Sequence, residues 1–205
     1  MDPATIKVIT AAYSMRREIK TIFITLLTLC LIPVLAVLLL TQVGLNIVSD
    51  ALVSGDPQNA QVDIHDPKTG EVIHHISETV IWPVSGIVTL EYGDSSPYQL
   101  FHTGIDIANG KTGDPVGAFM KGKVIYADTL SWGFGRHVII DHGYFVTSTY
   151  AHLDTLNVKV GDEVEMGQVV GTRGNTGWST GAHLHFQINV FKIPVNPRLF
   201  LAGNP

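Results

Sequence analysis

The chain has 205 residues and a formal net charge of −5, and charged residues make up only 15% of it. Soluble domains carry about 25% charged residues, so this composition excludes a disordered polyelectrolyte and argues against a wholly soluble chain. The acidic balance offers no basic surface of the kind that binds nucleic acid. One cysteine, Cys30, excludes an internal disulfide framework, whereas nine histidines could supply imidazole ligands to a metal.

The N-terminal part of the chain predicts a membrane anchor. Residues 1–20 hold four basic and two acidic side chains, and residues 21–49 hold no charged residue. Because about 20 apolar residues cross a hydrocarbon core of about 30 Å, we expect a transmembrane helix over residues 21–43, in which Pro33 is tolerated. The basic flank predicts a cytoplasmic segment over residues 1–20 and a C-terminal part outside the membrane. A buried soluble helix and a cleaved signal peptide are the alternatives, but a signal peptide has a shorter apolar core and an A-x-A-like site.

Residues 44–80 predict a stalk or linker, because they are mostly polar, contain two Asp-Pro steps and show little periodicity. Within this segment, the run VDIHDPKTGEVIHHI alternates on both sides of Pro-Lys-Thr-Gly, which predicts a small hairpin over residues 62–76. Its three histidines, His65, His74 and His75, are interpreted as solvated side chains.

Residues 81–205 predict an antiparallel all-β domain. Short β-rich runs such as KGKVIYAD and RHVIIDHG alternate with Gly or Asp every eight to twelve residues, and no amphipathic helical window of useful length appears. About 125 residues suffice to bury one hydrophobic core.

Three elements of this domain carry chemistry. His102 and Asp106 are four residues apart in FHTGIDIA, a spacing that places both side chains on one face of an extended strand. His183 and His185 are two apart in GAHLHF, so they project from one face while Leu184 points to the other. His152 follows an alternating run in YAHLDTL. Imidazole and carboxylate groups are both good zinc ligands, although each element alone is a weak signal.

Together these elements resemble the lysostaphin/LytM-type zinc metallopeptidases, which cut peptidoglycan peptides. The resemblance extends from about Trp82 to Leu201 and rests on the order and spacing of WPVSGIVTLEYG, FHTGIDIA, GDPVGAFMKGKVIYAD, WGFGRHVIIDHG, YAHLDTLNVKVGDEVEMGQVVGTRGNTGWSTGAHLHFQI and NPRLFL. It implies an antiparallel, β-sandwich-like peptidase domain over residues 81–205.

The resemblance also implies the roles of the site residues. One zinc ion per chain would be held by His102, Asp106 and His185, and the two catalytic histidines that are not ligands would be His152 and His183. Three protein ligands leave a fourth position open for water, as in catalytic zinc sites. The implied function is a zinc endopeptidase, anchored in the bacterial cytoplasmic membrane, that hydrolyses peptidoglycan stem or cross-bridge peptides in the periplasm or cell wall. Its anchor suits an envelope-spanning secretion, conjugation or phage machine.

Two rival functions stay open. Some relatives of this family have lost metal ligands and activate a separate amidase, and a vestigial component of an envelope complex is the second rival. All five site residues are present here, which favours the enzyme. The hairpin-like run VKVGDEVEMGQVVG also resembles biotinyl and lipoyl carrier domains, but it lacks their tip lysine and is interpreted as scaffold.

Further side chains are assigned smaller roles. His137 and His142 are interpreted as turn or surface groups, with a supporting or substrate-contacting role as the alternative. Arg173, Trp178 and Tyr150 are candidates for the walls of a substrate groove, because a peptide in an all-β cleft needs aromatic and hydrogen-bonding walls.

Overall fold

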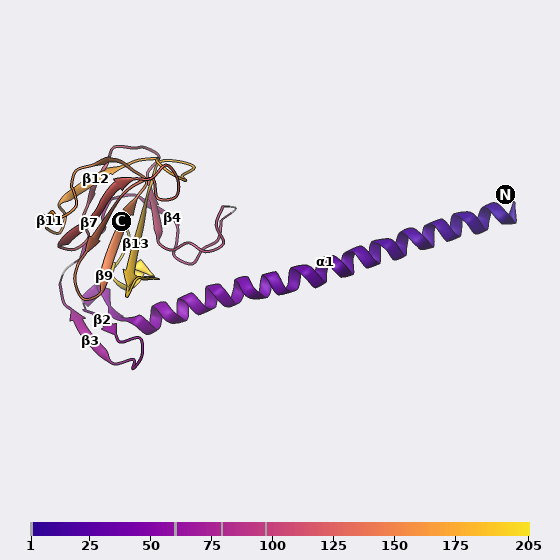
Figure 1. Cartoon of the computed structure of the whole chain (residues 1–205), viewed down its shortest axis with the longest axis horizontal. Coiled ribbons are helices and arrows are strands. Elements are labelled where there is room, and N and C mark those ends of the chain that lie inside the picture. The colour runs from indigo at the N-terminus through magenta and orange to yellow at the C-terminus, as the bar shows by residue number, and fades with distance from the viewer. Residues whose placement is uncertain (1, 60, 79, 97) are drawn as a thin grey trace. The chain divides into compact units, whose positions relative to one another are not determined.

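The computed structural model describes all residues except 1, 60, 79 and 97, and it divides the chain into two compact units, residues 1–43 and 44–205. The first unit is helical. Helix α1 runs from Pro3 to Leu52, so its last turns belong to the second unit (Figure 1). In the second unit the buried Ser49 hydroxyl accepts a hydrogen bond from the backbone N–H of Asn196, and Leu52 joins the hydrophobic core.

Helix α1 contains one segment, Met15–Val37, that is long and apolar enough to cross a membrane by its length and composition. This segment overlaps most of the predicted span and includes Pro33. Thr21, Thr25 and Thr28 donate their hydroxyl hydrogens to carbonyls of the preceding helical turn. Such internal bonds satisfy polar groups where no water is available.

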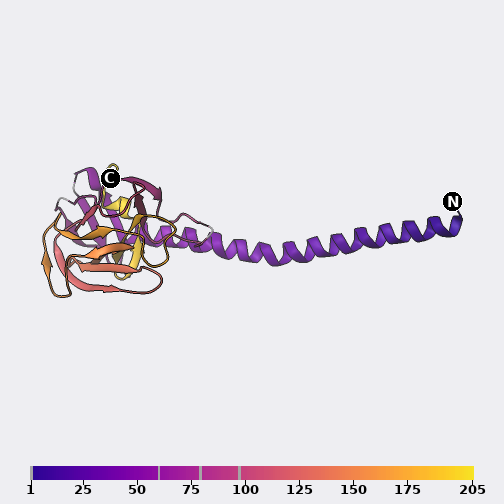
Figure 2. The ribbon, with the colours of Figure 1, turned by 90° about the horizontal axis from the view of Figure 1, so that it is seen from above.

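The second unit consists mostly of antiparallel strands, which confirms the predicted all-β class. Its largest sheet has the strand order β11-β7-β8-β9-β13-β5-β4, and β14 pairs with the C-terminal end of β13 beyond the part that pairs with β5. Figure 2 shows the ribbon turned by 90° and seen from above. The strands of this sheet are β4 (Ile87–Leu90), β5 (Ile105–Ala108), β7 (Gly122–Thr129), β8 (Arg136–Asp141), β9 (Val146–Ala151), β11 (Glu163–Val164), β13 (His183–Val190) and β14 (Ile193–Val195).

Two smaller sheets complete the unit. One has the order β10-β12-β6 and consists of β6 (Pro115–Gly117), β10 (Leu153–Leu156) and β12 (Val169–Arg173). The other has the order β1-β2-β3 and consists of β1 (Val53–Asp56), β2 (Gln61–His65) and β3 (Val72–Ile76). The 3-10 helix η1 (Pro57–Asn59) connects β1 with β2, and a second 3-10 helix, η2 (Pro197–Leu199), follows β14.

The sheet β1-β2-β3 lies where the sequence indicated a stalk. The predicted hairpin is present, because β2 pairs with β3 in antiparallel register. Val62, Ile64 and Ile76 are buried in the main core, and this burial orders the segment in spite of its turn residues. His75 is bonded to Asp63, and the ring of His74 packs edge-on against Tyr144.

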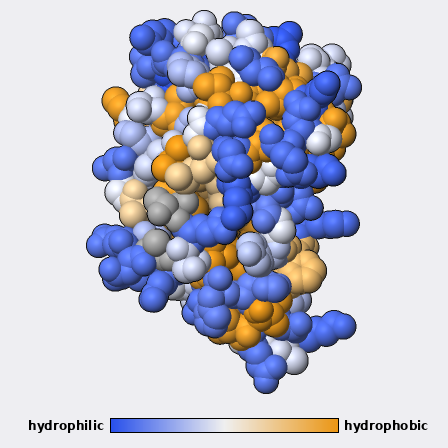
Figure 3. Space-filling view, turned by 90° about the vertical axis from the view of Figure 1, so that its left-hand side faces the viewer, coloured by the Kyte–Doolittle hydropathy of each residue, from blue (hydrophilic) through white to orange (hydrophobic). Residues whose placement is uncertain are grey.

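Along strand β13, alternate side chains face either the hydrophobic core or the candidate site. Leu184, Phe186, Ile188 and Val190 are fully buried on one face of β13 and belong to the hydrophobic core. The residues that alternate with them, beginning with His183 and His185, project from the opposite face. Outside the core, apolar patches interrupt a largely hydrophilic surface, as Figure 3 shows for one face of the molecule.

Candidate metal centre and active site

The register of the main sheet brings the predicted residues together. In the antiparallel pairing of β13 with β5, His185 stands opposite Asp106, and on its other side β13 places His185 opposite Ala151 of β9. Directly opposed residues in such pairs have Cβ atoms about 5 Å apart. His152 follows Ala151, and its ring centroid lies 6.1 Å from that of His185 and 4.7 Å from that of His183, so three distant segments of the sequence converge on one site.

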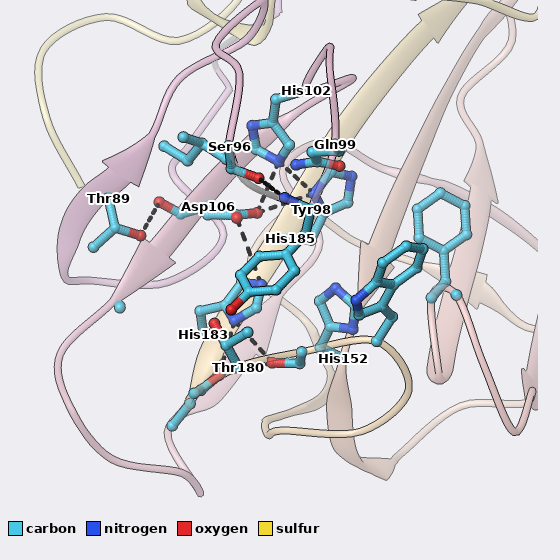
Figure 4. Close-up of a pocket in the computed structure, with 18 of the residues that line it drawn as sticks. Thr89, Ser96, Tyr98, Gln99, His102, Asp106, His152, Thr180, His183 and His185 are labelled. Atoms are coloured by element: carbon cyan, nitrogen blue, oxygen red, sulfur yellow. Dashed lines mark hydrogen bonds and ion pairs between the residues drawn. The ribbon is translucent and has the colours of Figure 1, made fainter. Parts of the chain in front are cut away.

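His102, Asp106 and His185 form a compact group of donor atoms (Figure 4). His102 Nε2 lies 2.9 Å from His185 Nδ1, and each of these nitrogens lies 3.0 Å from Asp106 Oδ1. His102 belongs to the loop before β5 rather than to a strand, so its position depends on that loop and not on the strand alternation that the sequence suggested. Both imidazoles are buried.

Proton counting indicates that this group suits a cation. His102 Nδ1 lies 3.0 Å from the carbonyl oxygen of Glu91, which can only accept, so Nδ1 carries the hydrogen and a neutral His102 presents a lone pair at Nε2. That lone pair faces the Asp106 carboxylate, which is also an acceptor. Two acceptors 3.0 Å apart require a proton or a cation between them. A backbone partner that fixes the imidazole tautomer in this way is usual for metal-binding histidines.

His183 and His152 flank the three donors. His183 Nε2 lies 3.6 Å from Asp106 Oδ2, while His183 Nδ1 lies 2.8 Å from the Gly181 carbonyl. The imidazole rings of His152 and His183 have centroids 4.7 Å apart. His152 is the bend residue between β9 and β10 and has a φ of 60°, a left-handed conformation that a non-glycine residue seldom adopts. Such backbone strain is concentrated at functional sites.

The site shifts the pKa values of its ionisable groups. Burial acts to raise the pKa of Asp106, but the two neighbouring imidazoles, His102 and His185, outweigh it and hold the pKa of this carboxyl well below its usual value. Burial, with the neighbouring His183 and His185, lowers the pKa of His152 to about 4. Burial also lowers the pKa of His185. The site therefore combines a carboxylate at Asp106 with imidazoles at His152 and His185 that burial favours in the neutral form, and metals bind carboxylates and neutral imidazoles.

The His185 ring is held by its neighbours. Phe134 stacks on it with ring centroids 5.5 Å apart, and a Cβ at Gly104 would lie 3.0 Å from His185 Cε1 and Nε2 and 2.4 Å from the Phe186 carbonyl oxygen. Only glycine fits such a close approach. His185 Nε2 is buried without a hydrogen-bond partner among the described residues. The contacts of His185 with Phe134 and Gly104 were not predicted, because the sequence does not show which loops meet the HLHF strand.

A cleft with a volume of about 910 Å³ opens over these five residues. Its wall contains the exposed aromatic side chains of Tyr98, Trp132 and Trp178, and Asp106 is the only Asp, Glu, Lys or Arg among the described residues that line it. Trp178 thus lies where the sequence placed it, and Trp132 and Tyr98 are additions that their exposed loop positions could not reveal. An aromatic wall with few charges suits an extended peptide.

Two predicted wall residues lie elsewhere. Arg173 is fully buried, pairs with Asp114 and donates to the Ser85 carbonyl 3.1 Å away, so its role is structural. Tyr150 is also fully buried, and its hydroxyl accepts the backbone N–H of Phe119. The pattern of polar and aromatic types could not distinguish these buried positions from exposed ones.

His137 and His142 are buried rather than on the surface. His137 stacks on Tyr126 and contacts Phe134, the residue that supports His185. His142 lies 2.7 Å from both the Lys121 carbonyl and the Ser148 hydroxyl, and burial lowers its pKa to about 4.

The model of peptidase family M23 matches residues 100–197, which contain all five site residues. A solved structure of a mutant of the catalytic domain of the prophage-encoded M23 protein EnpA from Enterococcus faecalis is 37% identical, with a TM-score of 0.50, and the match covers 54% of this chain and 88% of that one. The chain belongs to peptidase family M23. The M23 fold therefore accounts for the β-rich unit.

Curated M23 relatives include proteins with different activities. Murein hydrolase activator NlpD of Escherichia coli (strain K12) is 39% identical over 120 residues, which are 58% of this chain and 30% of NlpD. Lysostaphin of Staphylococcus simulans is 40% identical over 97 residues, which are 44% of this chain and 20% of lysostaphin. The chain thus matches less than a third of the length of either relative.

Proposed function

We propose that this M23 chain is a membrane-anchored zinc endopeptidase that hydrolyses peptide bonds in the stem or cross-bridge peptides of peptidoglycan. The observation that carries the proposal is the group of three donor atoms, His102 Nε2, Asp106 Oδ1 and His185 Nδ1, no more than 3.0 Å apart at the bottom of an aromatic cleft. These are the ligand types that zinc takes from proteins, at about 2.0–2.2 Å.

The three metal-binding residues and the two flanking histidines would have different roles. One zinc ion bound by these three donors would polarise the scissile carbonyl and lower the pKa of water. His152 is neutral at pH 7 and donates from Nδ1 to the Thr176 carbonyl, so its Nε2 is available to accept a proton. His183 is oriented by the Gly181 carbonyl in the same way. As a pair, they would move the proton and stabilise the developing oxyanion.

The apolar segment of α1 supports the placement of this activity at the outer face of the bacterial cytoplasmic membrane, with residues 1–20 in the cytoplasm. An anchored enzyme would act on wall close to the membrane, which suits local opening of peptidoglycan by a secretion, conjugation or phage machine. Deletion of residues 1–43 should release the protein from the membrane fraction, and unchanged membrane retention would contradict the anchor.

A non-enzymatic M23 module that activates a partner amidase is the second candidate, and the 39% identity to NlpD favours it. Purified peptidoglycan, incubated with the wild-type chain and with His102→Ala and His183→Ala variants, separates the two functions. We expect zinc-dependent release of new peptide termini by the wild type alone. Equal release by all three proteins, or release only when an amidase is added, would contradict the proposed enzyme.

A further inference from the structure

The loop between β12 and β13 carries Thr176, which the sequence analysis did not single out. Its carbonyl oxygen accepts the hydrogen of His152 Nδ1 at 2.8 Å. Its hydroxyl donates to the carbonyl of Leu153 at 2.9 Å and accepts the backbone N–H of Arg136, also at 2.9 Å. One residue therefore contacts the ring of His152, the residue that follows it, and the start of β8.

These hydrogen bonds, together with one from the His152 backbone, link three chain segments around His152. The backbone N–H of His152 donates to the carbonyl of Phe134 at 2.9 Å, and Phe134 lies two residues before Arg136. The segment 134–136, the pair His152–Leu153 and Thr176 are thus linked in turn. A residue held at a φ of 60° needs such support, because this left-handed conformation is unfavourable for a non-glycine residue.

Glycines allow the backbones of these three segments to approach closely enough for the hydrogen bonds to form. A Cβ at Gly135 would lie 2.5 Å from the carbonyl carbon of Thr176, and a Cβ at Gly174 would lie 2.4 Å from the backbone nitrogen of Asp154. Gly177 is packed against the backbone of Gly135 in the same manner. The loop therefore packs directly against residues 134–136 and residues 152–154, and the Thr176 hydroxyl bonds to both segments.

We infer that Thr176 is a positioning residue for His152: its hydroxyl holds the loop so that its carbonyl fixes the Nδ1–H tautomer of His152 and turns Nε2 toward the cleft. This inference rests on the proposed function, since it matters for catalysis only if His152 handles a proton. Thr176, which is not one of the five predicted site residues, would thus keep the strained His152 in place. A neutral His152 without this carbonyl could adopt either tautomer.

The test compares Thr176→Val, which removes the hydroxyl at nearly constant volume, with Thr176→Ser, which keeps it. Both are made in the full chain, and Thr155→Val serves as a matched control because Thr155 is an exposed residue of β10 whose hydroxyl bonds only to Asn157 and Thr172 among the described residues. For Thr176→Val we expect kcat to fall about tenfold or more, with KM and zinc content nearly unchanged, since small misplacements of a catalytic group cost up to about a hundredfold. Thr176→Ser and Thr155→Val should stay close to wild type.

A second measurement is independent of activity. The ¹⁵N chemical shifts of His152 at pH 7.5 report its tautomer, and we expect Nδ1–H in the wild type and in Thr176→Ser but a mixture in Thr176→Val. Wild-type kcat in Thr176→Val, equal loss in the valine and serine variants, or loss of cooperative unfolding in the valine variant would each overturn the inference. If the wild type itself cleaves no peptide, the proposed function fails, whereas the tautomer comparison still tests the role of Thr176.

Discussion

The buried His142 predicts an acid-sensitive fold. Its Nδ1 donates to the Lys121 carbonyl, so Nε2 must accept from the Ser148 hydroxyl, and both bonds are 2.7 Å long. A second proton on His142 would have to be accepted by Ser148 Oγ, whose own hydrogen would then turn to the Tyr150 hydroxyl 3.1 Å away, and the imidazolium charge would be buried. Burial accordingly lowers the pKa of His142 from 6.5 to about 4.

The magnitude follows from this difference in pKa. Below pH 6.5 the unfolded chain binds a proton at this histidine that the folded chain does not bind, so the free energy of unfolding falls as the pH falls toward 4. A shift of 6.5 to about 4 at 1.36 kcal/mol per unit amounts to about 3 kcal/mol in full, of which about 2 kcal/mol is lost between pH 7 and pH 5. This contribution is complete above pH 6.5.

Urea denaturation of residues 44–205 at pH 7 and pH 5 measures this loss. The comparison protein is His142→Asn, which keeps a donor for the Lys121 carbonyl but has no group that titrates in this range. We expect the variant to be less stable at pH 7, because it loses the Ser148 contact, but to lose about 2 kcal/mol less unfolding free energy than the wild type between the two pH values. The other ionisable groups cancel in this difference. The same pH dependence in both proteins would refute the reasoning.

Three further substitutions test the packing around the site. Gly104→Ala places a methyl 2.4 Å from the Phe186 carbonyl and 3.0 Å from the His185 ring. Its zinc affinity, measured by competition with a chelator, should fall about tenfold or more. Gly44→Ala is the control and should leave the zinc affinity unchanged, because a Cβ there has nothing within 4 Å. Trp178→Ala should raise KM for peptidoglycan fragments and leave zinc affinity unchanged, because Trp178 lines the cleft without touching the three donors; unchanged KM would remove it from the substrate wall. Tyr150→Phe strands the backbone N–H of Phe119, 2.9 Å from the lost hydroxyl, and should cost about 1–3 kcal/mol of unfolding free energy in urea titrations; a wild-type midpoint would contradict the buried network.

The β-rich unit could be predicted from the sequence because alternation is a local pattern, whereas the donor set came from the resemblance to a known peptidase family. Alternation in HLHF places His183 and His185 on one face of β13, and the burial of Leu184 on the other face confirms that alternation. Contacts between distant loops could not be predicted in this way. The bonds of Thr176 to Leu153 and Arg136 connect segments 23 and 40 residues away, and only the register of the folded sheets brings them together.

The sequence also could not show which polar residues and which polar segment are buried. Arg173 and Tyr150 have the polar groups of a binding wall, yet both are fully buried with internal partners. The segment over residues 53–76 contains prolines and many polar residues, but its few apolar side chains pack into the core and order it as a sheet. In each case the three-dimensional neighbour, and not the residue type, decided the role.

The central claim is that His102, Asp106 and His185 hold a zinc ion that supports hydrolysis of a peptide bond. Digestion of purified peptidoglycan in H₂¹⁸O, followed by mass analysis of the released peptides, tests it directly. We predict one ¹⁸O in each newly formed peptide carboxylate, no product after removal of zinc by a chelator, recovery on addition of zinc, and no product with His185→Ala. Peptides without ¹⁸O at a new carboxyl end, or an unchanged peptide pattern with the zinc-loaded wild type, would contradict the claim.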